Sequence, residues 1–428
     1  MQSKNDIDIK IEYCKPIAAG IQDAALNRLM DNLVICNGFQ TGRICSSNLT
    51  FNSKDKLCKE SKYIRGFKDF IQIYNIKNQD CSVIKSIISR RQSSLSVKID
   101  DSIYIWGGFS YTPLTDHELN TLKSIPQKKD IATYIDSYEI KIDKGKLSQK
   151  KIASNLPYPI CDGRVINHKD KIFFLGGGIY KYPYGFSTNF VVNNNITIGK
   201  GFFYMLYDKK NKKIKDEIIY LNNFPGIERM NHIFFEHKDF LYVMGGTNIS
   251  DDVDRSKGWS EYVPNNVIDN WKYDIEKNKW IKLENMPFLL TGSGYIKYKE
   301  KYLVIIGGCK YNNTILENNK KVKTCNIENN FFDFKLEFNN ISDIKMEKKK
   351  NGVSSYNYYF SNIIIIYDIE NNKFMLPSKR LDFNINNPKL VTHNDDIYII
   401  TGEMNPVLLN DVYYGEHPSL VCKLKIYF

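Results

Sequence analysis

The segment DSIYIWGG, residues 101–108, decides the fold of this chain, because five other segments repeat its pattern. Each has a turn, a short apolar run typical of a β-strand, and one or two glycines at its end. The other five are DNLVICNG (31–38), DKIFFLGG (170–177), DFLYVMGG (239–246), KYLVIIGG (301–308) and DDIYIITG (395–402). The last glycines of successive segments lie 70, 69, 69, 62 and 94 residues apart. This regularity predicts six similar units.

Each unit contains four strands. A strand such as SLSVKI (94–99) precedes the glycine segment by a tight turn, which predicts a hairpin. A third strand follows after an insertion, and a fourth, more polar strand is clearest in KWIKLENMP (279–287). In five units the third strand ends in Tyr and a polar residue: Tyr74-Asn75, Tyr138-Glu139, Tyr207-Asp208, Tyr273-Asp274 and Tyr367-Asp368. Six such units in succession predict the blades of an all-β propeller.

The double glycines, the Tyr273-Asp274 pair and Trp280 resemble the marks of a kelch repeat. The chain therefore resembles a six-bladed kelch β-propeller over its whole length, a single domain at 1–428 whose size comes from repetition rather than from several domains. We expect the blades at about 20–90, 91–160, 161–228, 229–289, 290–385 with an insertion at 309–360, and 386–428 together with 6–13.

The ring of blades also has to close. The C-terminal run SLVCKLKIYF (419–428) supplies the third strand of the sixth blade, which leaves that blade one strand short. The segment DIDIKIEY (6–13) alternates in polarity like a strand and is free to supply it. We expect the N-terminal strand to be the outer strand of the last blade, a closure that removes exposed sheet edges.

Composition narrows the class of protein. The net charge of +12 comes from 51 Lys and only 9 Arg, and since Arg is the residue that reads bases and phosphates bidentately, we expect no nucleic-acid partner. Nine Cys without a CxxC pair predict neither a disulfide framework nor a structural zinc site. The start MQSKNDIDIK has no apolar signal-peptide region, so we expect a cytoplasmic protein without membrane association.

Long insertions occur only between the second and third strands of the blades. They span about 40–65, 110–131, 179–201, 247–267, 309–360 and 403–418. Because these connections leave a blade on one face, the centre of that face is the expected binding site. The longest insertion contains KMEKKKNG and is either a solvated loop or a lid over the site.

Arginine is rare enough to be informative. Four of the nine fall where the chain enters the innermost strand of a blade: Arg90, Arg91, Arg164 and Arg229. One interpretation is that they tie adjacent blades through backbone carbonyls, and the other is that they form a cationic ring for a carboxylate. Arg229 is the preferred ligand-binding candidate because Asn231 and His232 lie beside it, with Arg91, Arg164 and Asn231 as further candidates.

Other polar and aromatic residues extend this set. Gln22, Asp23 and Asn387 lie at the corresponding junctions of the first and last blades. Glu403 and His417 follow the last glycine segment, and they either perform general acid–base chemistry or close a turn by hydrogen bonding. Tyr111 and Tyr182 lie in the insertions, where such rings either stack on sugars or pack loops onto blades.

The ending IYIITGEMNPVLLNDVYYGEHPSL (397–420) is similar to the last blade of bacterial kelch proteins of the N-acetylneuraminate epimerase (sialic acid mutarotase) type. The segment IYIWGGFSYTPLTD (103–116) is similar to uncharacterised bacterial kelch proteins that share that blade. The resemblance implies cofactor-free interconversion of sugar anomers, with a Glu and an Arg near the channel. Glu403 matches the motif, whereas the Arg is assigned by position.

Two functions remain open. The first is ring opening and closing of an acidic sugar, with Arg229 or Arg91 holding the carboxylate and Glu403 or His417 moving a proton, without cofactor or metal. The second is a non-catalytic module that binds a protein or a glycan with its loop-rich face. A copper radical oxidase is disfavoured because the six His show no ligand-like spacing.

Overall fold

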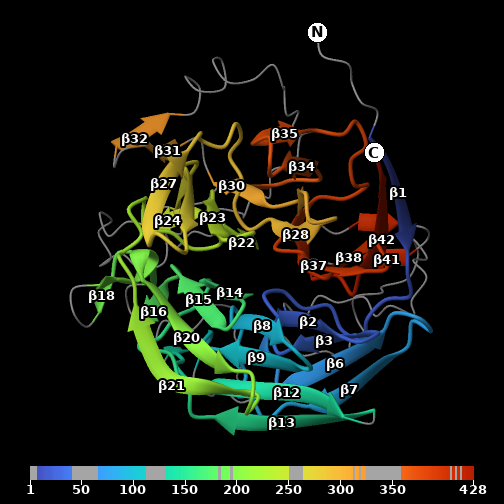
Figure 1. Ribbon diagram of the computed structural model, residues 1–428. Helices are drawn as coiled ribbons and strands as arrows, with labels where there is room; N and C mark the ends of the chain where they lie inside the picture. Colours follow the sequence, from blue (N-terminus) through green and yellow to red (C-terminus); the bar gives the residue numbers. More distant parts are fainter. Residues whose placement is uncertain are drawn as a thin grey trace, which may run out of the picture.

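The chain folds as an all-β, six-bladed propeller, as the repeats predict. In this computed structural model, six four-stranded antiparallel sheets are arranged around a central axis (Figure 1). The structure describes residues 7–40, 66–111, 131–143, 145–181, 185–192, 196–249, 264–311, 314–317, 320–323, 358–404, 407–409, 412–414 and 417–428. The segment KMEKKKNG (345–352) lies outside the described residues.

Each blade runs from an innermost strand at the axis to an outermost strand. Blades 1 and 2 contain β2 (Ala25–Leu29), β3 (Asn32–Cys36), β6 (Phe70–Asn75), β7 (Cys81–Lys85), β8 (Leu95–Ile99), β9 (Ser102–Trp106), β12 (Ser137–Asp143) and β13 (Lys146–Ile152). Blades 3 and 4 contain β14 (Arg164–His168), β15 (Lys171–Leu175), β20 (Phe202–Asp208), β21 (Lys213–Tyr220), β22 (Ile233–His237), β23 (Phe240–Met244), β26 (Asn270–Asp274) and β27 (Lys279–Leu283). Blades 5 and 6 contain β28 (Gly294–Tyr298), β29 (Tyr302–Ile306), β34 (Ile364–Asp368), β35 (Lys373–Met375), β37 (Lys389–His393), β38 (Asp396–Ile400), β42 (Val421–Tyr427) and β1 (Asp8–Tyr13).

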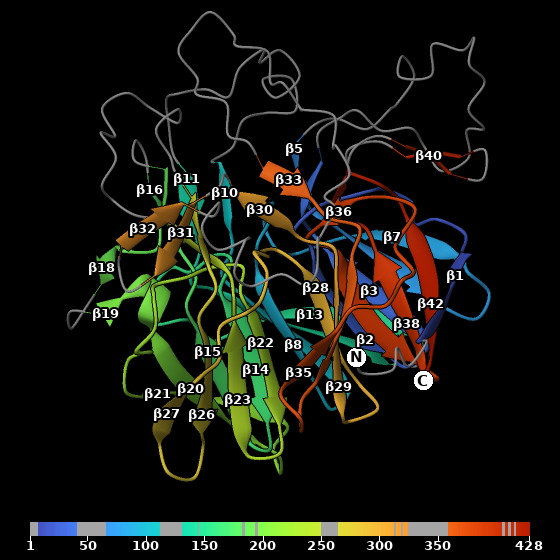
Figure 2. The ribbon, with the colours of Figure 1, turned by 90° about the horizontal axis from the view of Figure 1, so that it is seen from above.

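Short additional strands lie in the connections between the second and third strands of the blades. They are β4 (Phe39–Gln40), β5 (Gly66–Phe67), β10 (Phe109–Tyr111), β11 (Ile131–Thr133), β16 (Ile179–Lys181), β17 (Gly185–Ser187), β18 (Val191–Val192), β19 (Ile196–Thr197), β24 (Thr247–Ile249), β25 (Pro264–Val267), β30 (Cys309–Tyr311), β31 (Thr314–Glu317), β32 (Lys320–Lys323), β33 (Tyr358–Phe360), β39 (Glu403–Met404), β40 (Val407–Leu409) and β41 (Val412–Tyr414). The 3-10 helix η3 (Ile198–Lys200) lies in the third of these connections, and β36 (Ile385–Asn386) pairs with β39. In Figure 2, β10, β11, β30, β33 and β40 lie at one end of the blades, which we call the loop-rich face. In the part of the chain that the structure describes, no helix is long and apolar enough to cross a membrane.

The core is divided among the junctions between blades. Six buried apolar clusters each join strands of two neighbouring blades, including one that joins blade 6 to blade 1. Strand β9 shows why: all five of its residues are buried. Successive side chains point to opposite faces of a sheet, so Ile103 and Ile105 pack toward blade 1 while Tyr104 and Trp106 pack toward blade 3.

The glycine pairs sit where the end of the second strand lies against the chain that enters an innermost strand. Gly108 has a φ of +88°, and a Cβ there would lie 2.6 Å from the carbonyl oxygen of Gln92. A residue without a side chain is required for this conformation and this approach. The repeated glycines therefore mark the end of each second strand, as the sequence predicts.

The prediction for closing the ring is confirmed. Strand β1 pairs antiparallel with β42 from Asp8↔Tyr427 to Tyr13↔Cys422 and forms the outer edge of blade 6 (Figure 1). Ile9 joins the cluster between blades 5 and 6, and the ammonium of Lys423 contacts the Glu12 carboxylate at 2.6 Å. The two ends of the chain thus complete one sheet together.

Candidate functional site

A ring of six residues lies at the loop-rich end of the innermost strands. Each residue stands two positions before the first residue of its innermost strand and has a positive φ between 49° and 63°. The six are Asp23, Ser93, Asp162, Asn231, Gly292 and Asn387. Asn, Asp and Gly tolerate this conformation best, so the backbone itself explains part of the polar character of the ring.

Backbone hydrogen bonds connect these residues from blade to blade. The N–H of Ser93 donates to the carbonyl of Asp23 at 2.9 Å, and the N–H of Asp162 donates to that of Ser93 at 3.1 Å. The same link continues through Asn231, Gly292 and Asn387. The ring places side chains from all blades but the fifth at one end of the channel, including three that the sequence predicted: Asp23, Asn231 and Asn387.

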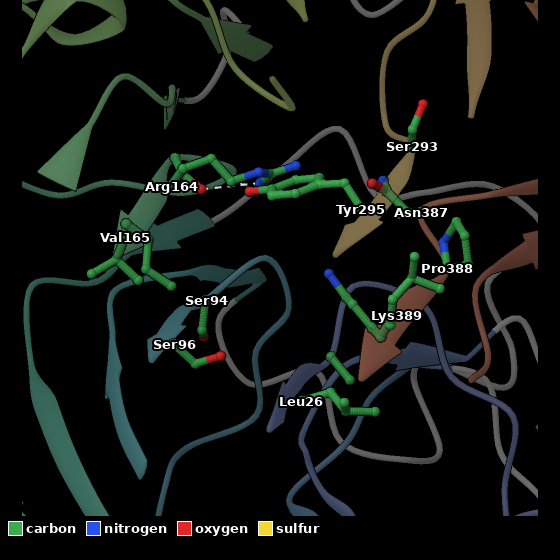
Figure 3. Close-up of a pocket in the computed structure, with 15 residues that line it drawn as sticks. Leu26, Ser94, Ser96, Arg164, Val165, Ser293, Tyr295, Asn387, Pro388 and Lys389 are labelled. Atoms are coloured by element: carbon green, nitrogen blue, oxygen red, sulfur yellow. Dashed lines mark hydrogen bonds between the residues drawn. The ribbon is translucent and has the colours of Figure 1, made fainter. Parts of the chain in front are cut away.

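A cavity of about 220 Å³ lies in the channel next to this ring (Figure 3). Innermost strands of five blades line it, with Leu26, Ser96, Arg164, Tyr295 and Lys389 among the contributing side chains. Figure 3 shows the ammonium end of Lys389 pointing into the cavity.

Arg164 and Lys389 occupy the same register position in their blades. Arg164 pairs across its hairpin with Leu175, and Lys389 pairs with Ile400. The other blades have Ala25, Leu95, Ile233 and Gly294 at this position. Two cations thus stand where other blades place small or apolar residues.

Arg164 covers the side of the channel that belongs to blade 4. Its Nε donates to the carbonyl of His232 at 2.8 Å, and its Nη1 donates to that of Gly163 at 3.0 Å. Its Nη2 reaches Asn231 Oδ1 at 3.4 Å. Burial raises the pKa of Tyr295, while the neighbouring guanidinium of Arg164 acts in the opposite direction.

Lys389, unlike Arg164, has no hydrogen-bond or ion-pair partner for its charged group among the described residues. Burial lowers the pKa of Lys389, the carboxyls of Asp23 and Asp162 oppose this shift, and the positive charge of Arg164 adds to it.

Two carboxyls of the ring have perturbed acidity. Burial and, after it, the charge of Asp23 raise the pKa of Asp162 to about 7, against the opposing effects of Ser93, Arg164 and Lys389. Burial also raises the pKa of Asp23, whose carboxylate accepts a hydrogen bond from Gln22 Nε2 at 3.1 Å. Since Ser93 alone separates them in the ring, the two carboxyls form one titrating pair.

Arg229 and Arg91 lie away from this cavity, with side chains 0% and 1% exposed. Arg229 donates to the carbonyls of Ile227 and Gly245, at 2.9 and 3.0 Å, and pairs with the Asp269 carboxylate. Arg91 makes the equivalent contacts in blade 2, with the Gly107 carbonyl at 3.1 Å and with Asp136. These contacts engage backbone carbonyls, as in the structural interpretation of the sequence, but those with Gly245, Asp269, Gly107 and Asp136 lie within one blade.

Glu403 and His417 lie on the loop-rich side of blade 6. Glu403 pairs with Asn386, the position that Phe39, Phe109 and Cys309 occupy in other blades, and Asn386 Nδ2 approaches its carboxylate at 3.5 Å. His417 is buried, with its ring packed edge-on against Phe39. The structure does not bring these two into the cavity lining. Their proposed roles remain predictions.

The two tyrosines are only partly placed. The backbone of Tyr111 pairs with that of Ile131 between β10 and β11. Tyr182 lies outside the described residues. Among those that are described, no three His, Cys, Asp or Glu side chains group in a way that could hold a metal ion.

Sequence reasoning missed Lys389, Asp162 and Tyr295. Lys389 is one of 51 lysines, so its residue type did not single it out. Asp162 follows Cys161 and belongs to no recognisable motif. Aligning the six hairpins by register would have found the two cations, because Arg164 and Lys389 each stand two residues after a ring residue.

Fold and site together define a six-bladed β-propeller with a charged central cavity. No family model matches the chain. N-acetylneuraminate epimerases from Salmonella paratyphi B and Salmonella typhi are 26% identical over 200 residues and 25% identical over 201 residues, in each case 45% of this chain. The match spans less than half of these relatives as well, 45% of their length.

A solved structure is similar over nearly the whole chain. The structure of YjhT superposes with a TM-score of 0.55 and 12% identity, covering 97% of this chain and 98% of that one. This structural similarity shows that the two chains share the same fold. The chain is therefore a six-bladed propeller distantly related in sequence to N-acetylneuraminate epimerases.

Proposed function

We propose that this chain is a cofactor-free carbohydrate enzyme that interconverts the anomers of an acidic sugar, such as N-acetylneuraminate, at the loop-rich end of the channel. The name of the relatives supports the reaction class. The observation that carries the proposal is the carboxyl pair of Asp23 and Asp162 at the channel end, beside the cations of Arg164 and Lys389.

Anomer exchange needs one base and one acid at the same time. The base removes the proton of the anomeric hydroxyl, the bond from the anomeric carbon to the ring oxygen breaks, and the acid protonates that oxygen. After rotation of the carbonyl group the ring closes on the other face and both protons return, so no electrons are gained or lost. Two coupled carboxyls that share a proton near neutral pH supply this combination.

Glu403 remains a candidate for moving a proton at the rim of the site, as the resemblance of its motif implies. Arg229 and Arg91 are less suited to hold a substrate carboxylate, because their donors are already engaged by backbone carbonyls and by Asp269 and Asp136. Arg164 and Lys389 take over that role in the proposal.

Saturation-transfer NMR on N-acetylneuraminate tests the proposal directly. Wild-type protein should exchange the anomers faster than the spontaneous rate, and Asp162→Asn should lower the catalysed rate by roughly 10²–10⁴-fold. Glu403→Gln, measured in parallel, tests the role of the rim carboxyl. Asp216→Asn, at an exposed site on β21, is the matched control and should be without effect. Exchange no faster than the spontaneous rate for N-acetylneuraminate and common hexoses would refute the enzyme.

A non-catalytic binding module is the second candidate. A sheet formed by β24, β25, β31 and β32 joins the connections of blades 4 and 5, with a parallel pairing of Asn266↔Ile315. Such a platform on the connections of the loop-rich face favours a surface for a glycan or a protein. A glycan or pull-down screen that yields a partner, together with absent anomer exchange, would decide for this candidate.

A further inference from the structure

We propose that Lys389 and Arg164 form a binding site for one small monovalent anion inside the channel. The site takes a carboxylate or a halide. Binding of the carboxylate of an acidic sugar rests on the function proposed above. Binding of a halide does not depend on that function.

The first argument is the missing partner of Lys389. Lys389 is half-buried, and an ammonium that is partly withdrawn from water is normally paired or hydrogen-bonded, because its lost hydration is otherwise uncompensated. The ammonium of Lys389 lies in the cavity and, among the residues that the structure describes, makes neither contact. Asp23 and Asp162 act on it only through their field. A bound anion would supply the partner.

The second argument is the second cation. Arg164 faces the same cavity, and its charge acts on Lys389 in the unfavourable direction. Its orientation is fixed by the carbonyls of His232 and Gly163, Nη2 makes a long contact with Asn231, and the guanidinium also interacts with the Tyr295 side chain. A guanidinium held in this way is preorganised to bind an anion together with the ammonium.

Neutral donors complete the cavity. The hydroxyl oxygen of Ser96 accepts a hydrogen bond from Asn27 Nδ2 at 2.9 Å, which leaves its own proton for a ligand. Figure 3 shows Ser96 and Tyr295 beside the cavity together with the two cations. By contrast, Ser94 and Ser293 already donate to the carbonyls of Gly107 and Gly307.

Size limits the ligand. The cavity of about 220 Å³ is smaller than the roughly 300–1,000 Å³ of pockets that enclose a drug-sized molecule. A halide, a formate or the carboxylate of a sugar fits, but a whole nine-carbon sugar does not. In N-acetylneuraminate the carboxylate is attached to the anomeric carbon, so a carboxylate held at Lys389 would bring the anomeric hydroxyl toward the ring that carries Asp23 and Asp162.

The test uses the full chain and chloride as its probe. Chloride-35 NMR should show excess line broadening with wild-type protein, and sodium formate should reverse it. Lys389→Met should abolish the broadening, Lys389→Arg should retain it, and Lys279→Met, at an exposed site on β27, should behave as wild type. Melting curves of each variant establish that it is folded. Wild-type broadening that is absent, or that survives in folded Lys389→Met, would overturn the site.

Experiments with the sugar distinguish this anion site from the proposed function. N-acetylneuraminate should compete with chloride, and Lys389→Met should raise the KM for anomer exchange by roughly tenfold or more, the loss expected for one charged hydrogen bond. Chloride binding without competition by the sugar would leave the anion site standing and remove the sugar from it. Anomer exchange with an unchanged KM in Lys389→Met would preserve the enzyme and reject this site for its carboxylate.

Discussion

Arg229 and Asp269 form a closed pair between the chain entering blade 4 and the third strand of that blade. The guanidinium contacts the Asp269 carboxylate through Nη2 and the carbonyl of the same residue through Nη1 at 3.1 Å. The carbonyls of Ile227 and Gly245 take further donors, so four of the five N–H groups of Arg229 are engaged. The Arg91–Asp136 pair repeats this arrangement in blade 2.

Arg229→Gln should therefore affect stability rather than ligand binding. Removing one partner of a buried ion pair leaves the other uncompensated and costs about 3–5 kcal/mol. Urea unfolding of the two single variants Arg229→Gln and Asp269→Asn and of the double variant would measure the coupling. Lost activity with unchanged stability would instead assign Arg229 to the ligand.

Some features could be predicted from the sequence because they repeat. The segment at 101–108 and its five counterparts locate every second strand, and the spare alternating segment before Tyr13 identifies the closing strand. The cavity could not be predicted in the same way. Lys389 and Arg164 lie 225 residues apart, and only the register of two separate hairpins brings them to one position. The acidity of Asp162 depends on burial and on Asp23, neither of which a local motif records.

The glycine argument can be tested with a matched pair. Gly145 and Gly108 both have positive φ, +76° and +88°, but a Cβ at Gly145 meets nothing within 4 Å. Gly145→Ala should lose only the conformational cost of about 1–2 kcal/mol. Gly108→Ala should lose about 1–3 kcal/mol more, because its Cβ would overlap the Gln92 carbonyl. Equal losses in urea unfolding would mean that the crowding at Gly108 is relieved by small shifts.

The carboxyl pair predicts how stability changes with pH. The pKa of Asp162 rises from 3.8 to about 7 on folding, so between these values the folded state binds more protons than the unfolded state. The free energy of unfolding should then fall as pH rises from about 4 to 7, and Asp23 contributes in the same direction.

Asp162→Asn keeps a residue that tolerates positive φ and removes this titration. The variant should gain stability relative to wild type at pH 8 and show a flatter dependence between pH 4 and 7. Urea unfolding at several pH values provides the measurement. A difference between the two proteins that is independent of pH would show that Asp162 does not titrate in this range.

Closure of the ring by β1 predicts a loss of stability for the whole molecule when that strand is removed. Deleting residues 1–13 removes all six β1–β42 pairs, the packing of Ile9 and the Glu12–Lys423 contact, and it exposes the edge of β42. Because each blade packs on both neighbours, opening one sheet should lower the melting temperature of the entire propeller by several degrees. Deleting only 1–6 retains every β1 pair and serves as the control. If the two deletion variants had the same melting temperature, blade 6 would be stable with three strands and β1 would contribute nothing to the stability of the ring.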